Sequence, residues 1–68
     1  MNMQPVRSSA IAAVGYDPSK RELFIQFTSH PTTYTYVGVP ITVYTDFMSA
    51  SSKGQYYDLF IKDRYSTR

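Results

Sequence analysis

The chain has 68 residues, with seven Lys or Arg and five Asp or Glu, which give a formal net charge of +2. A chain this short forms a single domain and buries only about 60% of the surface that its unfolded form exposes. It contains no cysteine, which excludes disulfides and thiolate metal sites, so we expect stability to come from its Phe and Tyr rings or from self-association. The charge suits a polyanionic partner but falls short of the Lys/Arg stripe of a dedicated DNA-binding protein.

The first third of the chain predicts a lead-in, a strand and a turn. Residues 1–7 show no periodicity and contain Pro5, so we expect an extended, loosely ordered segment. Small apolar residues from Ala10 to Tyr16 predict a strand. Residues 17–20, Asp-Pro-Ser-Lys, predict a turn, because Asp suits its first position and Pro presets φ at the next. The apolar run at 10–14 is too short for a signal segment or a bilayer span, which predicts a cytoplasmic protein.

Alternating side chains predict two further strands, at residues 21–28 and 33–37, joined by a turn at 29–32. The alternating apolar and aromatic residues on one face are Leu23, Ile25 and Phe27 in the first of these strands, and Tyr34 and Tyr36 in the second. Both connections are short, so the three strands should form an antiparallel meander.

The last third of the chain predicts two helices. Pro40 fits a first helical turn, and the spacing of Val43 and Phe47 predicts a helix that ends near Ala50. After a break, Ser52 can cap a second helix, in which apolar residues recur at helical spacing as far as Tyr65. Residues 66–68 should have nothing to pack against and be loosely ordered. The predicted fold is α+β, β-β-β-α-α, with both helices on one face of the sheet.

Several short segments keep a specific order and spacing. They are Ser8-Ser9-x-Ile11, Gly15-Tyr16-Asp17, Leu23-x-Ile25-x-Phe27, Tyr34-x-Tyr36-x-x-Val39-Pro40-x-x-Val43-Tyr44, Ala50-x-Ser52-x-Gly54-x-Tyr56-Tyr57 and Ile61-Lys62-x-x-Tyr65. Together they resemble the KTSC domain. The resemblance implies a small stand-alone bacterial or phage protein, from a family that also occurs at the C-terminus of some lysyl-tRNA synthetases. It implies a suggested RNA-binding role and no established activity.

The chain departs from that family pattern at three places. The turn at 29–32 lacks the usual glycine and is one residue longer, and Lys62 stands where the family favours Arg. Asp58 places a negative charge where the family is usually neutral, which weakens any expectation of phosphate contacts at that end of the helix.

Tyr34 and Tyr36 allow two interpretations. With Phe24 or Phe27 they could form a platform on which unpaired bases stack. Alternatively, they pack under the helices with their hydroxyls at the rim. We favour the core position, because so small a domain needs its large rings inside.

The segment Ser52-Lys53-Gly54 could hold an anion, since the backbone N–H groups at a helix start are unpaired and Lys53 is adjacent. An ordinary capped turn with a solvated lysine is the commoner arrangement, and we favour it. Lys62 could extend a basic surface but can instead pair with Asp58, four residues earlier. Arg7, Lys20 and Arg21 would join this surface only if the first turn points the same way.

No arrangement of residues predicts catalysis, a metal site or a cofactor. His30 is the single histidine and lies in a polar turn, where we expect it to be exposed. Asp58 and Asp63 are five residues apart on the predicted helix and point away from one another. We therefore expect a protein without enzymatic activity.

The leading functional hypothesis is a non-catalytic binding module for RNA or single-stranded nucleic acid, with no metal and no membrane contact. Its candidate phosphate-binding residues are Ser52, Lys53, Gly54 and Lys62, and its candidate tyrosine contacts are Tyr16, Tyr34, Tyr36 and Tyr56. The alternative is a homo-oligomeric interaction or ligand-sequestering protein, encoded by a phage, whose marginal core is completed by self-association.

Overall fold

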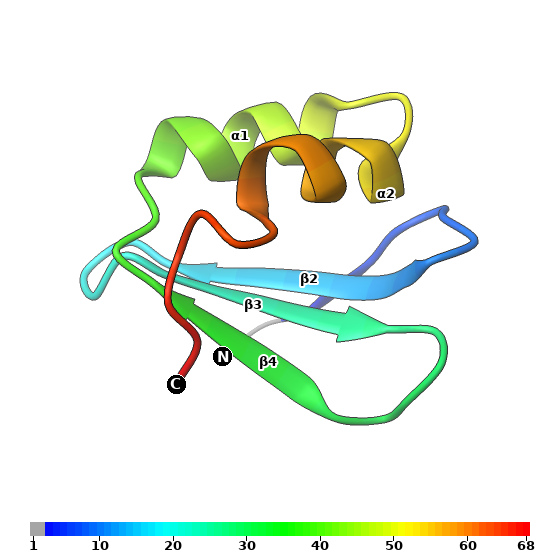
Figure 1. The fold of residues 1–68 in the computed structure, drawn as a ribbon, viewed down its shortest axis with the longest axis horizontal. Helices are drawn as coiled ribbons and strands as arrows, with labels where there is room; N and C mark the ends of the chain where they lie inside the picture. The colour runs from blue at the N-terminus through cyan, green and yellow to red at the C-terminus, as the bar shows by residue number, and fades with distance from the viewer. Residues whose placement is uncertain (1–2) are drawn as a thin grey trace.

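Four antiparallel strands form one sheet in the order β1-β2-β3-β4, and helices cover one of its faces (Figure 1). This computed structural model describes residues 3–68. The strands are β1 (Gln4–Pro5), β2 (Ile11–Asp17), β3 (Glu22–Phe27) and β4 (Thr33–Val37). The helical segments are α1 (Ile41–Ser49), α2 (Lys53–Tyr56) and η1 (Tyr57–Ile61), a π-helical turn that continues α2.

The α+β class and the meander β2-β3-β4 are confirmed, but the sheet has four strands where the sequence predicts three. The additional strand β1 pairs Gln4 with Val14 and Pro5 with Ala13. Val6 extends the contact by donating its backbone N–H to the Ala12 carbonyl at 3.1 Å. Two residues are too few to show alternation, and proline is depleted in strands, so β1 leaves no sequence signal. Residues 1 and 2 of the predicted lead-in lie outside the described residues.

The register of the sheet places Tyr34 and Tyr36 under the helices. Leu23 lies opposite Tyr36, and Ile25 lies opposite Tyr34. Leu23, Ile25 and Tyr36 all belong to the core, whose buried members also include Ile11, Val14, Val39, Phe47 and Ile61. The core interpretation is therefore confirmed for Tyr36, whereas Tyr34 is half-buried and packs against the edge of the core.

Both predicted helix starts are confirmed. Pro40 immediately precedes α1, and its carbonyl accepts the Val43 N–H at 3.0 Å. Ser52 caps α2, because its Oγ accepts the Gln55 N–H at 3.3 Å. The predicted end of the second helix at Tyr65 is wrong. Helical backbone stops at Ile61, and Asp63 adopts a positive φ of 60°.

Lys62 therefore follows the helix, which removes the helical spacing that the predicted Asp58–Lys62 pair requires. No salt bridge joins these two side chains in residues 3–68.

The C-terminal tail contacts the outer edge of β4, where the sequence predicts nothing for it to pack against. Val37 donates its N–H to the Ser66 carbonyl, and Arg68 donates its N–H to the Thr35 carbonyl, both at 2.9 Å. The Arg68 guanidinium also lies 2.9 Å from a carboxylate oxygen of Glu22, a side chain only 8% exposed. The tail thus pairs an edge that would otherwise present free backbone groups.

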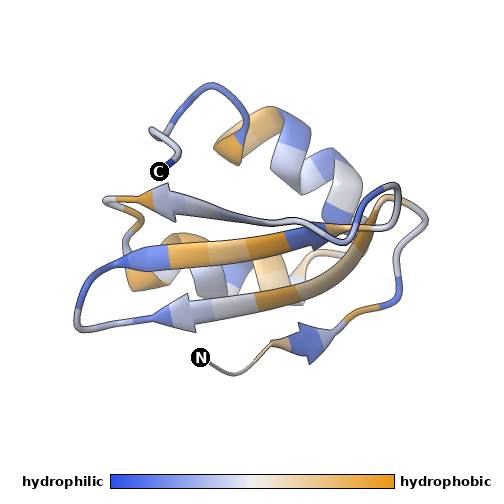
Figure 2. Ribbon diagram, turned by 90° about the horizontal axis from the view of Figure 1, so that it is seen from below, coloured by the Kyte–Doolittle hydropathy of each residue, from blue (hydrophilic) through white to orange (hydrophobic). Residues whose placement is uncertain are grey.

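The opposite sheet face carries no helix in the described part of the chain (Figure 2). The alternation along β3 assigns Glu22, Phe24 and Gln26 to this face. Phe24 pairs with Gly15 on one side and Thr35 on the other, and its ring is largely buried. None of the helices in residues 3–68 is long and apolar enough to cross a membrane.

Ile61 is fully buried, whereas Ile41 at the start of α1 is 55% exposed. We expect Ile61→Val to lower the free energy of unfolding by about 0.5–1.5 kcal/mol, because it removes one packed methylene. The matched variant Ile41→Val should change it by less than about 0.5 kcal/mol. Urea unfolding followed by circular dichroism measures both. Equal effects of the two substitutions would contradict the described packing.

Candidate functional site

The structure brings the predicted Ser52-Lys53-Gly54 segment against the loop that precedes β2. Together they line a hollow of about 220 Å³, which we call the serine hollow. Its lining residues are Arg7, Ser8, Ser9, Ser51, Ser52, Lys53 and Gly54. Two cationic side chains and four hydroxyls therefore meet at one place, and none of these lining residues is acidic.

Local hydrogen bonds fix the two segments of the serine hollow. Ser8 Oγ accepts the N–H groups of Ala10 at 3.1 Å and Ile11 at 3.2 Å, which shapes the loop. Lys53 Nζ donates to the Ala50 carbonyl at 2.7 Å, which holds the ammonium group beside the helix start. Gly54 lies so close to the loop that an added Cβ would stand 3.4 Å from the Ala10 Cβ. The loop and the helix start are therefore in direct contact.

Of the three N-terminal cations considered for a basic surface, the structure places only Arg7 here. Lys20 and Arg21 lie in and beside the turn between β2 and β3, at the other end of the sheet (Figure 1). Arg7, Ser8 and Ser9 are separated from Ser52 by more than forty positions in the sequence. These residues come together because the loop before β2 crosses the start of α2. No local pattern in the sequence predicts this contact.

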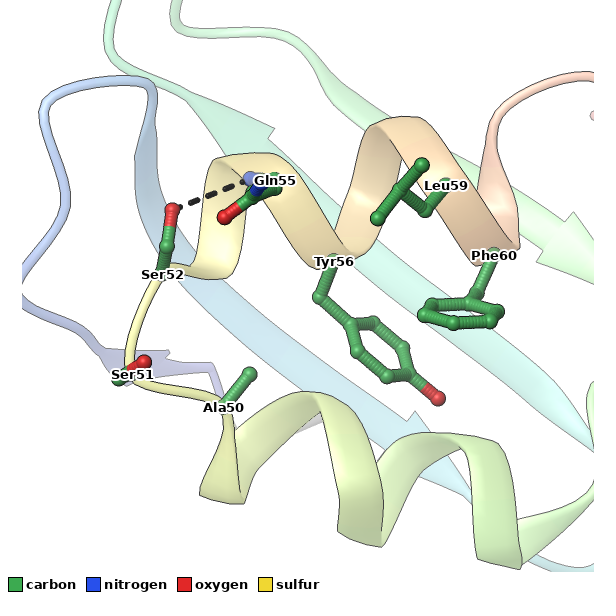
Figure 3. A pocket seen from close by; sticks show the side chains of 7 residues that line it. All are labelled: Ala50, Ser51, Ser52, Gln55, Tyr56, Leu59 and Phe60. Carbon is green, nitrogen blue, oxygen red and sulfur yellow. Dashed lines mark hydrogen bonds between the residues drawn. The ribbon is translucent and has the colours of Figure 1, made fainter.

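A groove between α1 and the second helix adjoins the serine hollow. It has a volume of about 240 Å³, shares Ser51 and Ser52 with the hollow, and we call it the helix groove. Figure 3 shows its side chains, which are Ala50, Ser51, Ser52, Gln55, Tyr56, Leu59 and Phe60. The polar hollow and this largely apolar groove therefore lie next to each other, on either side of Ser51 and Ser52.

Two aromatic rings lie side by side in the helix groove (Figure 3). The centroids of Tyr56 and Phe60 are 4.7 Å apart, and the Tyr56 ring also stacks on Phe47 of α1 at 5.6 Å. Burial raises the pKa of Tyr56, with a further contribution from Asp46, so its hydroxyl stays neutral. Phe60 is 53% exposed and offers ring surface to solvent.

The remaining predicted site residues lie elsewhere. Tyr16 donates its hydroxyl to the Val39 carbonyl and stacks on Tyr44, with ring centroids 4.9 Å apart. Tyr34 and Tyr36 line a different cavity, beside Tyr57. Lys62 is exposed beyond the end of the helix. The structure thus brings together Ser52, Lys53, Gly54 and Tyr56 from the predicted set and separates the other four.

The titratable side chains form no arrangement suited to a metal ion. Within residues 3–68 there is no group of three His, Cys, Asp or Glu side chains that could hold one. His30 is exposed in the loop between β3 and β4, as the sequence predicts.

Comparison with known proteins establishes the family. The model of the KTSC domain matches residues 7–65, which is most of the chain. The chain belongs to the KTSC domain family. The match includes Arg7 and every other residue of the serine hollow.

A relative from Tsukamurella paurometabola, described only as a protein, is 44% identical over 63 residues, covering 93% of this chain and 92% of the relative. A lysine–tRNA ligase from Nostoc sp. is 40% identical over 57 residues, covering 84% of this chain and 10% of the ligase. The crystal structure of a KTSC domain protein from Yersinia pestis is similar with a TM-score of 0.94 and 48% identity, covering 98% of this chain and 93% of that one.

Substitution of two glycines of this KTSC domain by alanine tests the backbone conformation at these positions. Gly54 is helical with room for a methyl group, so Gly54→Ala should raise the free energy of unfolding by about 0.4–1 kcal/mol. Gly38 has open space around it but a φ of +73°, so Gly38→Ala should lower that energy by about 1–2 kcal/mol. Chemical denaturation measures both changes. Stabilisation by Gly38→Ala would contradict the structure.

Proposed function

We propose that this KTSC domain is a non-catalytic module that binds single-stranded nucleic acid, with RNA as the first candidate. A backbone phosphate occupies the serine hollow, and the adjacent base stacks in the helix groove. The observation that carries the proposal is that a cationic, hydroxyl-lined hollow shares Ser51 and Ser52 with a groove that holds two aromatic rings.

The serine hollow has the donors that a phosphate needs. Arg7 supplies a guanidinium fork, and Lys53 has ammonium hydrogens beyond the one given to Ala50. Ser8 and Ser52 accept backbone N–H groups through Oγ, which leaves each hydroxyl hydrogen free to donate to a ligand. These groups come from two segments, so the anion would connect the loop before β2 to the start of α2.

The helix groove supplies the stacking surface. Phe60 is 53% exposed, so a base can cover its ring without displacing another side chain. Tyr56 lies beside it and is itself held by Phe47, which limits the entropy lost on binding. Stacking of one base on an aromatic side chain contributes about 1–3 kcal/mol and tolerates any base, so we expect little sequence preference.

RNA is the first candidate because a similar stretch occurs in a lysine–tRNA ligase, where it makes up a tenth of the length. The ligase's name connects that protein with tRNA. This domain would then contribute a general contact with an RNA strand.

Self-association is the second candidate function, and one observation favours it. Leu59 and Phe60 are neighbours in η1 and are each 53% exposed, an unusual exposure for two large apolar side chains. In this alternative, a second copy of the chain covers Phe60 in place of a base.

Fluorescence anisotropy of a labelled single-stranded RNA, titrated with the protein at several salt concentrations, tests the proposal. Binding should weaken steeply with salt, and Arg7→Gln should reduce the slope of log K against log salt by about 0.7, the value for one lost contact with a single-stranded phosphate. The matched control Lys20→Gln should leave the slope unchanged. Phe60→Ala should weaken binding by about 1–3 kcal/mol without changing the slope.

The absence of salt-dependent binding at about 100 μM protein and low salt would contradict the proposal. Equal effects of Arg7→Gln and Lys20→Gln would contradict the placement of the phosphate. A dimer in sedimentation velocity that Phe60→Ala dissociates, with no RNA binding, would favour self-association.

A further inference from the structure

A third depression, which we call the aromatic cavity, opens on the other side of the second helix, between η1 and β4. Its volume of about 340 Å³ exceeds that of the serine hollow and the helix groove and lies within the range of roughly 300–1,000 Å³ typical of small-molecule sites. Its lining side chains include Phe27, His30, Tyr34, Tyr36, Tyr57 and Thr67. They come from two strands, a loop, the helix and the C-terminal tail, so only the complete fold assembles the cavity.

Aromatic rings at steep angles to one another form the walls. Phe27 meets Tyr34 edge to face at 5.7 Å and 63°, and it meets Tyr57 at 5.2 Å and 74°. Tyr36 and Tyr57 are 6.0 Å apart at 73°. Phe27, Tyr34 and Tyr57 are each half-buried, so part of each ring stays exposed at the cavity and can contact a flat ligand.

A pair of hydroxyls gives the cavity its polar group. The hydroxyl oxygens of Tyr36 and Tyr57 are 2.7 Å apart, and one donates to the other. Two hydroxyls that share one hydrogen bond retain one further hydrogen, which can be donated to a ligand. Burial raises the pKa of Tyr36, and the bond with Tyr57 adds to the shift, so this hydroxyl stays protonated. The two hydroxyls therefore offer a neutral hydrogen-bond donor beside the aromatic rings that line the cavity.

The tail and the loop add polar groups at the rim. Backbone hydrogen bonds of Ser66 and Arg68 to β4 hold Thr67 in place, and His30 lies exposed in the loop. The described lining residues include no Asp, Glu, Lys or Arg. A phosphate would find no guanidinium or ammonium there, an aliphatic ligand would leave the hydroxyls unpaired, and a cation would find ring faces but no carboxylate.

We propose that this cavity binds one uncharged, planar aromatic ring that carries hydrogen-bond acceptors, the chemistry of a nucleobase. The ring lies among Phe27, Tyr34 and Tyr57, and an acceptor atom of the ligand receives the free hydrogen of the Tyr36–Tyr57 pair. A free nucleoside and an unpaired base of a strand share this chemistry. The cavity has no lining residue in common with the serine hollow or the helix groove, so this inference does not rest on the proposed function.

Titration of the ¹⁵N-labelled full chain with uridine and with adenosine, followed by amide chemical shifts, tests this proposal. We expect saturable shifts at His30, Tyr34 and Thr67 and a dissociation constant in the millimolar range or below. Benzyltrimethylammonium, a cationic aromatic probe without a hydrogen-bond acceptor, should bind about two- to tenfold more weakly, because it leaves the free hydroxyl hydrogen unpaired.

Tyr57→Phe keeps the ring and removes one hydroxyl, so it should weaken nucleoside binding about two- to tenfold. Tyr44→Phe removes a hydroxyl from a ring that stacks on Tyr16, outside the cavity, and should bind like the unchanged protein. If Tyr57→Phe does not fold, His30→Ala in the exposed loop replaces it and should also weaken binding. Lys20→Gln, outside the serine hollow, the helix groove and this cavity, should leave nucleoside binding unchanged.

A single-stranded oligonucleotide is titrated in the same way, to test an unpaired base of a strand as the ligand. Cavity shifts with either nucleoside support the proposal, and cavity shifts with the oligonucleotide alone also support it and identify a strand as the source. The proposal is overturned if no probe gives saturable cavity shifts at about 10 mM. It is also overturned if benzyltrimethylammonium binds as well as the nucleosides, or if the cavity variant that folds binds like the unchanged protein.

Discussion

Two neighbouring tyrosines that contact two different layers hold this small fold together. Tyr56 stacks on Phe47 of α1, whereas Tyr57 contacts Phe27 and shares a hydrogen bond with Tyr36 of the sheet. Successive residues of a helix point about 100° apart, so one short helix can meet both partners at once. The second helix is thereby held beside α1 on the same face of the sheet (Figure 1), with the helix groove on one side and the aromatic cavity on the other.

The π-helical turn explains why this short helix both anchors the core and exposes apolar side chains. Lys62 donates its N–H to the Tyr57 carbonyl, five positions back, at 2.8 Å. The widened turn carries Ile61 into the core with no exposed surface, while Leu59 and Phe60 remain more than half exposed. π-Helical turns occur frequently at functional sites, and this one lines the helix groove and the aromatic cavity, two of the depressions for which we propose ligands.

Local patterns in the sequence predict most of the fold but only a third of the residues that line the candidate site, namely Ser52, Lys53, Gly54 and Tyr56. Alternation predicts β2, β3 and β4, and the chemistry of Pro40 and Ser52 predicts both helix starts. The pairing of β1 and of the tail depends on backbone groups of distant strands. Side-chain periodicity in the sequence therefore does not predict it. The helix stops at Ile61 although the apolar spacing continues to Tyr65, because Asp63 adopts a positive φ. Arg7 joins Lys53 only through the crossing of two distant segments.

The central claim is that Tyr57 joins the second helix to the sheet through its hydroxyl bond with Tyr36. A double-mutant cycle with Tyr36→Phe, Tyr57→Phe and the double variant, followed by urea unfolding, tests it most directly. The account predicts coupling of about 0.5–1.5 kcal/mol, so that the double variant loses less stability than the sum of the two single variants. Strictly additive losses would contradict it.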